Sequence, residues 1–238
     1  DTISFSGDRL EQMYSDEPGQ WSGIHLLRSS RDNLLDFVRI KNALAGVRID
    51  SLSNNGNPKL IISNSIIKNM QVAGLLMYNG EVGAFNNLVY NCGQFLVYAA
   101  LGGSYDLKQN TFAGFNSSMS RQGPAVYFAD HLQGANSVQT AALDLSLVNN
   151  IIWGGNANEL LIERKGAMPF LASVMSNLLK TNKPEFNAAN MINQDPLFFE
   201  AGKGNFRLSA NSPAINKGRD LTADRFFNAL LRLDLQKK

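Results

Sequence analysis

Two carboxylates of this chain stand next to short apolar runs, and paired carboxylates are what glycoside hydrolysis requires. Retaining and inverting glycosidases place two carboxyl groups about 5–9.5 Å apart across the scissile bond. Asp130 follows the apolar run at 125–129, and Glu163 ends a similar run at 159–163. We name these two residues as catalytic candidates, although neither lies in a recognisable motif.

Three tyrosines and a further carboxylate form a second set of candidates, for ligand binding. Tyr78, Tyr98 and Tyr127 lie near the ends of apolar runs, and Asp50 ends another. Tyrosines stacked side by side can hold sugar rings by apolar contact and by hydroxyl hydrogen bonds. The alternative is that tyrosine is simply a favourable residue in a half-exposed strand. The sequence leaves both interpretations open.

The remaining polar residues do not form a familiar metal or cofactor site. A polysaccharide lyase would need a cluster of carboxylates for calcium, with an Arg or Lys base beside it, whereas Asp and Glu are scattered here. Arg164 and Lys165 fit a solvated turn. His25 and His131 have no paired acid or serine in a motif, so a surface or capping role is favoured. With no phosphate loop, zinc spacing or nucleophile elbow, we expect no cofactor and no metal.

Composition narrows the class of protein. The chain of 238 residues suffices for one domain with a substantial core. Its 22 Lys and Arg against 20 Asp and Glu give a formal charge of +2, without a basic block, so no nucleic-acid partner is expected. The single Cys92 cannot form an internal disulfide. The apolar runs are too short for a transmembrane segment, and we take a signal peptide to be absent or already removed.

An internal repeat places the candidates on a regular scaffold. The pattern recurs as NSIIKN (64–69), NNLVYN (86–91), QNTFAG (109–114), NNIIWG (149–154) and SNLLKT (176–181). With Ile40 from a weaker first copy, the second apolar residue falls at positions 40, 67, 89, 112, 152 and 179. The steps of 27, 22, 23, 40 and 27 residues indicate a regular coil with insertions. The longest step contains the polar segments 115–124 and 131–140.

Two further apolar runs flank each copy of the repeat. An alternating run precedes it, as in KLIIS at 59–63, and another follows after a variable joint, as in GLLMY at 74–78. Period-2 alternation and β-branched residues indicate strands, since α-helical repeats would need longer segments of period 3.6. Three short strands per unit describe one coil of a parallel β-helix, with coils about 4.8 Å apart. We predict an all-β, single-stranded parallel β-helix with three strands per coil and roughly six coils.

Asparagine is unusually frequent, with 27 residues, and the coil explains why. A bend of about a right angle between strands is easiest through a left-handed residue, a conformation that Asn tolerates. Stacked on successive coils, the side chains would form a ladder of amide hydrogen bonds. The predicted column consists of Asn64, Asn86 or Asn87, Asn110, Asn149 or Asn150, and Asn177. A structural role is favoured over a catalytic one for this column.

Alignment of the runs that follow the repeat assigns their inward and outward residues. We align the runs ending at positions 50, 78, 98, 129 and 163 on their last two residues. Inward residues are then Ile49, Met77, Val97, Phe128 and Ile162. Outward residues are Asp50, Tyr78, Tyr98, Ala129 and Glu163, with Tyr127 outward two positions earlier. Asp50 and Glu163 lie four coils apart, too far for a catalytic pair, whereas Asp130 and Glu163 lie one coil apart.

The C-terminal stretch DPLFFEAGKGNFRLSANSPAINKG (195–218) resembles a known pattern. In this pattern an Asp-Pro-Leu-Phe strand, a short loop and an aromatic-x-Leu strand precede Ser-Pro-Ala-Ile-x-x-Gly. The stretch resembles bacterial right-handed β-helix surface proteins of the pectate-lyase-like type, in particular the choice-of-anchor Q group of Bacteroides-type bacteria. PGQWSGI (18–24) looks like a coil opening of that group. The resemblance implies a right-handed coil and an exported protein linked to polysaccharides, but it supplies no reaction.

Together these observations predict a β-helix domain over 1–218, which can be the C-terminal part of a longer helix, and a capping segment over 219–238. In pectate-lyase-like folds substrate usually lies along the sheet formed by the strands that follow the variable joint. In this chain those strands carry the tyrosines. We expect a monomer at the cell surface, outside the cell or in the periplasm, with a polysaccharide or surface glycan as partner. Asp50, Tyr78, Tyr98 and Tyr127 would bind it. A divergent polysaccharide lyase or glycosidase, and a structural spacer or adhesin, remain the alternatives.

Overall fold

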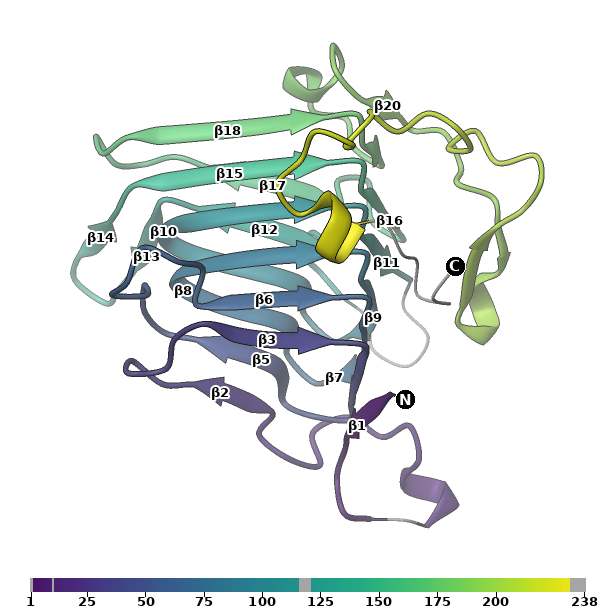
Figure 1. Cartoon of the computed structure of the whole chain (residues 1–238), viewed down its shortest axis with the longest axis horizontal. Helices are drawn as coiled ribbons and strands as arrows, with labels where there is room; N and C mark the ends of the chain where they lie inside the picture. The colour runs from purple at the N-terminus through teal and green to yellow at the C-terminus, as the bar shows by residue number, and fades with distance from the viewer. Residues whose placement is uncertain (1, 10, 116–120, 232–238) are drawn as a thin grey trace.

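The chain winds into stacked coils of parallel strands (Figure 1). A computed structural model describes residues 2–9, 11–115 and 121–231. Each coil contributes strands to three faces, which we number in the order in which a coil visits them. The predicted all-β, parallel β-helix is confirmed.

The first face is a sheet in which neighbouring strands run parallel. In spatial order its strands are β1 (Ile3–Phe5), β4 (Val38–Lys41), β7 (Ile66–Met70), β9 (Leu88–Cys92), β11 (Thr111–Gly114), β16 (Ile151–Gly154), β19 (Leu178–Leu179) and β20 (Met191–Ile192). Because β1 pairs with β4, the N-terminal strand belongs to the coil that precedes the one containing β4.

The second and third faces share two long strands, which pass from one face to the other without a break. The second face contains β2 (Ile24–Leu26), β5 (Ala45–Ile49), the first parts of β8 (Ala73–Phe85) and β10 (Phe95–Lys108), β12 (Val126–Ala129) and β17 (Leu160–Glu163). The third face contains β3 (Asn33–Asp36), β6 (Leu60–Ser63), the second parts of β8 and β10, β15 (Leu143–Val148) and β18 (Phe170–Met175).

Short elements lie outside the coil. Two antiparallel hairpins consist of β13 (His131–Gln133) with β14 (Val138–Thr140), and β21 (Phe198–Glu200) with β22 (Asn205–Leu208). Three 3-10 turns are η1 (Gln12–Tyr14), η2 (Pro184–Phe186) and η3 (Ala201–Lys203), and η4 (Phe227–Leu231) is a π-helical turn. The predicted insertion at 131–140 is thus a hairpin. Of the insertion at 115–124, residues 116–120 lie outside the described residues.

The strand register follows the repeat found in the sequence. The second apolar residues of all six copies are paired in one continuous row on the first face: Ile40, Ile67, Val89, Phe112, Ile152 and Leu179. All six side chains are buried. The row continues with Phe5 before Ile40 and with Ile192 after Leu179. The predicted repeat marker is therefore confirmed coil by coil.

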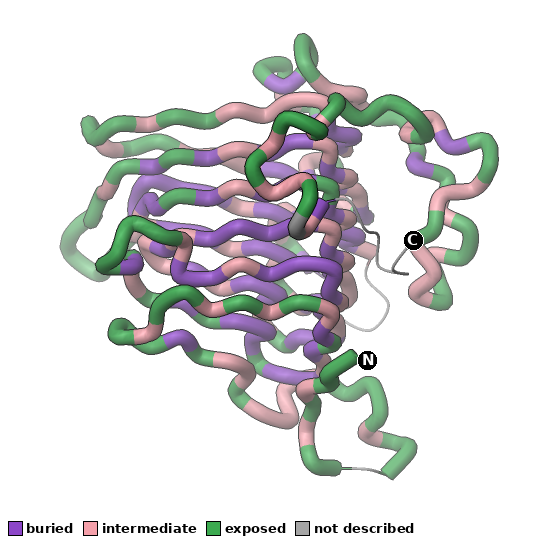
Figure 2. The backbone as a smooth tube through the Cα atoms, in the orientation of Figure 1, coloured by how far each residue is buried: buried purple, intermediate pink, exposed green. Residues whose placement is uncertain are grey.

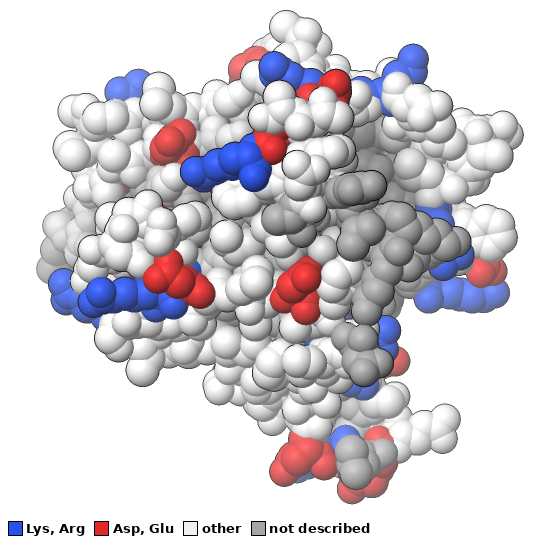
Figure 3. Space-filling view, in the orientation of Figure 1, with Lys and Arg blue, Asp and Glu red and all other residues white. Residues whose placement is uncertain are grey.

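The core is a continuous column inside the coils, which Figure 2 shows as buried backbone along the middle strands. Strand side chains alternate between core and surface; β4, for example, reads buried, exposed, buried at Val38, Arg39 and Ile40. Charged side chains of both signs are interspersed over the third face, seen in Figure 3. A stack of this kind buries its apolar residues only where one coil covers the next.

Asparagines form a ladder at the corner between the third and first faces. Asn87 Nδ2 donates to Asn110 Oδ1 at 3.0 Å, Asn110 Nδ2 to Asn150 Oδ1 at 2.9 Å, and Asn150 Nδ2 to Asn177 Oδ1 at 2.9 Å. The same oxygens also accept the backbone N–H of the preceding Asn. The series continues from Asn177 to Asn190 Oδ1 at 2.9 Å. We call these five residues the asparagine column.

The column predicted from the sequence is off by one residue at its start. Ser65, not Asn64, occupies the column there, and its backbone N–H donates to Asn87 Oδ1 at 3.0 Å. Asn64 instead precedes the column and has a left-handed backbone, with φ of 49°. The left-handed residues on the other coils are Phe37, Asn86, Gln109, Asn149 and Ser176. Each Asn-Asn pair therefore has two structural roles. The first residue adopts the left-handed conformation of the bend, and the second forms the hydrogen bonds of the ladder.

The C-terminal residues pack along the side of the coil. Lys108 Nζ lies 2.6 Å from carboxylate oxygens of both Asp106 and Asp224, and the Phe226 ring centroid lies 4.7 Å from that of Phe85. Figure 1 shows this yellow segment beside the third face. Residues 232–238 of the expected capping segment 219–238 lie outside the described residues. The capping role stays a prediction.

Candidate functional site

The three tyrosines expected to bind a ligand lie in contact on the second face. Tyr78 comes from β8, Tyr98 from β10 and Tyr127 from β12, and all three are half-buried. The ring centroids of Tyr78 and Tyr98 are 5.9 Å apart, and those of Tyr98 and Tyr127 are 5.2 Å apart. We call these residues the tyrosine row.

The order of pairing within the row differs from the alignment made on the sequence. Tyr98 pairs with Leu76 of the preceding strand and with Tyr127 of the following one, while Tyr78 pairs with Ala100. The predicted alignment of Tyr98 with Tyr78 is therefore wrong by two residues. The reason is that β10 continues through two alanines that the alignment left beyond the strand. The diagonal offset still leaves the two tyrosine rings in contact.

Ring orientation decides what the row offers to a ligand. The planes of Tyr98 and Tyr127 make an angle of 17°, so each ring covers one face of the other. Phe95 packs against both, with centroid distances of 4.9 Å to Tyr98 and 6.0 Å to Tyr127. The stacked contact engages one face of Tyr98 and one face of Tyr127, and ring edges and hydroxyl groups belong to the rest of the row. Stacking of sugar rings on the other aromatic faces, considered from the sequence, stays a prediction.

Asp50 lies at the N-terminal end of the row in a group of charged residues. Its carboxylate accepts a hydrogen bond from Arg48 Nε at 2.9 Å and lies 2.8 Å from His25 Nε2. Partial burial opposes ionisation, but the hydrogen bonds from Arg48 and His25 outweigh it and lower the pKa of Asp50. The Arg48 guanidinium lies 6.0 Å from the Tyr78 ring centroid. Asp50 is therefore an ionised acceptor adjoining the first tyrosine.

Glu163 lies at the other end of the row, next to the last tyrosine. Its Oε2 accepts the hydroxyl hydrogen of Tyr127 at 2.6 Å, and the Glu163 side chain is 41% exposed. Burial, followed by the neighbouring Glu163 carboxylate, raises the pKa of Tyr127. Tyr127 therefore keeps its proton at neutral pH and acts as a hydrogen-bond donor.

His131 lies between the two carboxylates named as catalytic candidates. Its Nδ1 is 3.2 Å from Asp130 Oδ1, and its Nε2 is 3.9 Å from Glu163 Oε2. The His131 side chain is 5% exposed. The structure thus brings Asp130 and Glu163 to opposite sides of one imidazole, next to Tyr127.

Asp130 has contacts that hold a turn. Its carboxylate is buried and accepts the backbone N–H groups of Lys165 and Gly166, both at 2.8 Å. Burial raises the pKa of Asp130, but these hydrogen bonds and His131 outweigh burial and lower it. An ionised, enclosed carboxylate is suited to fixing the 163–166 turn, as expected for Arg164 and Lys165. A catalytic role for Asp130 and Glu163 stays a hypothesis.

Sequence reasoning missed the partners of both histidines. His25 and Asp50 are 25 positions apart and meet only because β2 pairs with β5, where His25 lies opposite Arg48. His131 meets Glu163 because β12 pairs with β17. The sequence does contain a signal for these two contacts. When the strands are aligned, Asp50 falls beside His25 and Glu163 beside His131, each one coil away.

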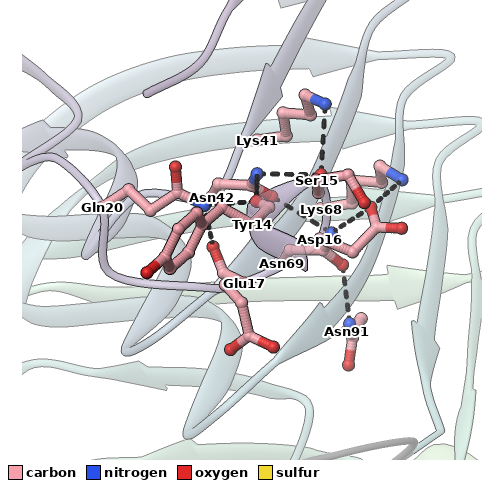
Figure 4. Close-up of polar contacts among 10 residues, drawn as sticks. All are labelled: Tyr14, Ser15, Asp16, Glu17, Gln20, Lys41, Asn42, Lys68, Asn69 and Asn91. Carbon is pink, nitrogen blue, oxygen red and sulfur yellow. Dashed lines mark hydrogen bonds and ion pairs between the residues drawn. The ribbon is translucent and has the colours of Figure 1, made fainter. Parts of the chain in front are cut away.

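A second polar region lies at the corner between the first and second faces, shown in Figure 4. Lys68 Nζ and Asn69 Nδ2 both donate to Asp16 Oδ1, at 2.9 and 2.8 Å, and Asn91 Nδ2 donates to Asn69 Oδ1 at 2.6 Å. A hollow of about 640 Å³ adjoins these groups. Because the polar atoms shown bind one another, we assign them the role of fastening the N-terminal segment to the coil.

Within the part of the chain that the structure describes, no three His, Cys, Asp or Glu side chains cluster as a metal site. No helix among those residues is long and apolar enough to cross a membrane. The candidate site is the second face, because it carries a row of tyrosines between two carboxylates.

Comparison with known proteins agrees with the coil geometry. A family described as "Right handed beta helix region" matches residues 2–112. No curated protein and no solved structure matches the chain. The matched residues cover the N-terminal part of the stack, and the parallel strands continue in register beyond them to β20. By its fold, this chain is a right-handed parallel β-helix protein.

Proposed function

We propose that this protein binds a polysaccharide or surface glycan along the second face, as a monomer. The observation that supports the proposal is the tyrosine row, a contiguous set of half-buried phenols that ends in Asp50 on one side and Glu163 on the other. Glycans carry many hydroxyl groups, which pair with phenols and carboxylates. A flat strand surface with such groups suits an extended chain more than a compact ligand.

The spacing of the row supports an extended ligand. Tyr78, Tyr98 and Tyr127 come from three consecutive coils, and coils are stacked about 4.8 Å apart. A polymer lying along the stack would meet a similar set of groups at each coil. Asp50 and Glu163 are four strand steps apart, about 19 Å, so they contact different parts of such a polymer and cannot act on one bond.

We place the protein outside the cell, at the cell surface or in the periplasm. The support is the resemblance of 195–218 to choice-of-anchor Q surface proteins of Bacteroides-type bacteria. In the structure this stretch contains the β21–β22 hairpin, with the short loop and the aromatic-x-Leu strand in the expected places. Detection of the protein in surface or periplasmic fractions of the source cells would test the location.

A glycan array with the purified protein tests the proposal, followed by titration calorimetry on each positive glycan. Tyr78→Ala should weaken binding at least several-fold, because it removes one phenol from the row. Tyr14→Ala is the matched control, since Tyr14 lies on η1, away from the second face. An array without any binding, or equal loss in both variants, would contradict the proposal. A negative array would favour a structural spacer or adhesin.

The second candidate function is a polysaccharide lyase or glycosidase. It is favoured by one observation, the position of His131 between Asp130 and Glu163 beside the Tyr127 hydroxyl. Acid–base catalysis needs groups in hydrogen-bond reach of a reacting atom, and Glu163 is the exposed member of this set. New chain ends formed from an acidic polysaccharide, and lost in Glu163→Gln, would establish this function.

A further inference from the structure

A second hollow lies at the N-terminal end of the second face, where the chain turns towards the third. Its volume is about 530 Å³, and it is lined in part by His25, Arg28, Asp50, Ser51 and Asn79. Hydrogen-bond donors and a hydroxyl group converge here within one opening. The proposed glycan function uses only Asp50 from this set.

A buried lysine lies beneath the hollow. Lys59 directly precedes β6, and its side chain is fully buried. Its Nζ lies 2.8 Å from Ser51 Oγ, and 3.3 Å from each of the carbonyl oxygens of Leu27 and Arg28. Among the residues that the structure describes, Lys59 forms no ion pair within 4.0 Å.

Nζ donates to all three oxygens, and after losing one proton it can keep both carbonyl bonds and accept the Ser51 hydroxyl hydrogen instead. A neutral amine has two N–H donors and one lone pair, which match two carbonyl acceptors and one hydroxyl donor. Burial lowers the pKa of Lys59, and the more distant Glu81 partly opposes this effect. The hydroxyl hydrogen of Ser51 would then point to the Lys59 lone pair. In this state Ser51 Oγ is a better nucleophile than a serine hydroxyl without a neighbouring base, because the amine can accept its proton during the attack.

We propose that Ser51 and Lys59 form a nucleophile–base pair that hydrolyses small acyl esters. The support is the 2.8 Å contact between the hydroxyl of Ser51, a residue that lines the hollow, and a buried amine without a carboxylate partner among the described residues. A serine activated by an adjacent lysine is a recognised arrangement in acyl transfer. Nothing in the glycan proposal requires this activity.

The reaction proceeds in two balanced steps. Ser51 Oγ forms a bond to the acyl carbon, while its proton passes to Lys59 Nζ. Nζ then gives this proton to the departing alkoxide, which leaves as an alcohol, and the acyl group stays on Ser51. Water next attacks the acyl carbon after losing a proton to Nζ, and that proton returns to Ser51 Oγ as the carboxylic acid leaves.

The hollow also contains donors for the negative oxygen that forms during the attack. Arg28 and the side-chain amides of Asn54 and Asn79 line it together with Ser51. Such donors stabilise the charge that develops on an acyl oxygen. O-acylated sugars on the adjoining tyrosine row would be the natural substrates. Only this choice of substrate rests on the proposed glycan binding.

Hydrolysis of p-nitrophenyl acetate by the purified full chain tests the proposal, together with labelling by a fluorophosphonate probe. We expect a single adduct on Ser51, located by peptide mass spectrometry. Ser51→Ala should abolish the adduct and lower the hydrolysis rate by about 100-fold or more. Absence of labelling on Ser51 in the wild-type protein would overturn the proposal without any variant.

Lys59→Met and Ser104→Ala complete the test. Lys59→Met keeps the length of the side chain and should also lower the rate by about 100-fold. Ser104→Ala, an exposed position of β10 on the third face, should leave it unchanged. Circular dichroism checks that each variant is folded, and Ser51→Cys with iodoacetamide supplies a second test of nucleophile activation. Equal rates in Lys59→Met and the wild type would contradict the role of Lys59. A failed glycan array leaves these results unaffected.

Discussion

The asparagine column and the tyrosine row both repeat along the stack, but they repeat in different ways. In the column, each Asn from 87 to 177 makes the same contacts, to the next Asn and to a carbonyl oxygen of a neighbouring coil. In the row, three consecutive coils carry tyrosine, but only Tyr98 and Tyr127 pair directly. The same register places Arg48, Leu76 and Leu161 on the other coils.

The difference reflects burial. The column side chains from Asn87 to Asn177 are at most 3% exposed, so each amide must find partners within the protein. Half-buried tyrosines can reach water, so their hydroxyl groups impose no such condition. The column therefore constrains the stacking of coils, whereas the residues of the row are free to differ from coil to coil.

Asn110→Ala should break the column with the largest effect on stability. The change leaves the backbone N–H of Asn87 and the carbonyl of Ala84 buried without their present partner. Each unsatisfied buried group costs about 1–3 kcal/mol, so we expect a loss of about 3–5 kcal/mol. Urea unfolding measures this change. Asn136→Ala, at an exposed position of the 131–140 segment, should change stability by less than about 0.5 kcal/mol.

Asp130→Asn tests the carboxylate beside the row as a structural element. The pKa of Asp130 is lowered in the folded protein, so its stabilising contribution is present above the unfolded-state pKa of about 3.9. That contribution is lost as pH falls through the folded-state pKa. At pH 7 we expect Asp130→Asn to cost about 1.5–3 kcal/mol, because neutral hydrogen bonds replace charged ones.

The pH dependence of unfolding separates the contribution of the Asp130 carboxylate from the loss of stability in acid that other groups cause. Wild-type stability should fall more steeply below about pH 4 than that of Asp130→Asn. Chemical denaturation from pH 2.5 to 7 would measure both curves. Parallel curves would show that the Asp130 carboxylate does not hold the turn at 163–166.

Tyr98→Ala should act on binding more than on folding. Tyr98 is the central member of the row and contacts both other tyrosines, so we expect affinity for a bound glycan to fall by about 1–2 kcal/mol. Tyr98→Phe keeps the ring and removes only the hydroxyl group. Because hydroxyl groups form part of the surface of the row, we expect this variant to lose part of the affinity that Tyr98→Ala loses. Calorimetry with both variants measures this. Full affinity in Tyr98→Phe would show that hydroxyl groups do not contribute.

Tyr127→Phe should have the smallest effect. It removes the hydrogen bond to Glu163, which we expect to cost about 0.5–1.5 kcal/mol of stability. Because the pKa of Tyr127 is raised, its phenol should ionise above the usual pH range of a tyrosine in an ultraviolet titration of the wild type. Loss of that late-ionising component in Tyr127→Phe would assign it, and an unchanged titration curve would refute the assignment.

Periodicity allowed most of the coil to be predicted, because each strand marker is an apolar residue forced into the core. The markers from Ile40 to Leu179 were therefore placed correctly. Asn64 was misplaced because bend and ladder residues are adjacent, and on this coil the bend residue is Asn while Ser65 occupies the ladder position. Tyr98 was misaligned because two alanines on β10 give little sign of being in a strand.

The site was predicted less completely than the coil. Apolar periodicity reports which side chains are buried, but it does not report which polar atoms meet across coils. The contact of Lys59 with Ser51, for example, depends on the turns between faces, which have no repeat. Those turns differ in length from coil to coil, so only coordinates bring such pairs together.

The uniform bonding of the asparagine column also has a consequence for how such a chain can change in length. Since every amide meets an identical neighbour, one whole turn of the spiral can be duplicated or deleted in a gene without altering the contacts at the new junction. Each of the three faces would then grow or shrink by one strand. The length of the stack is thus adjustable in fixed increments.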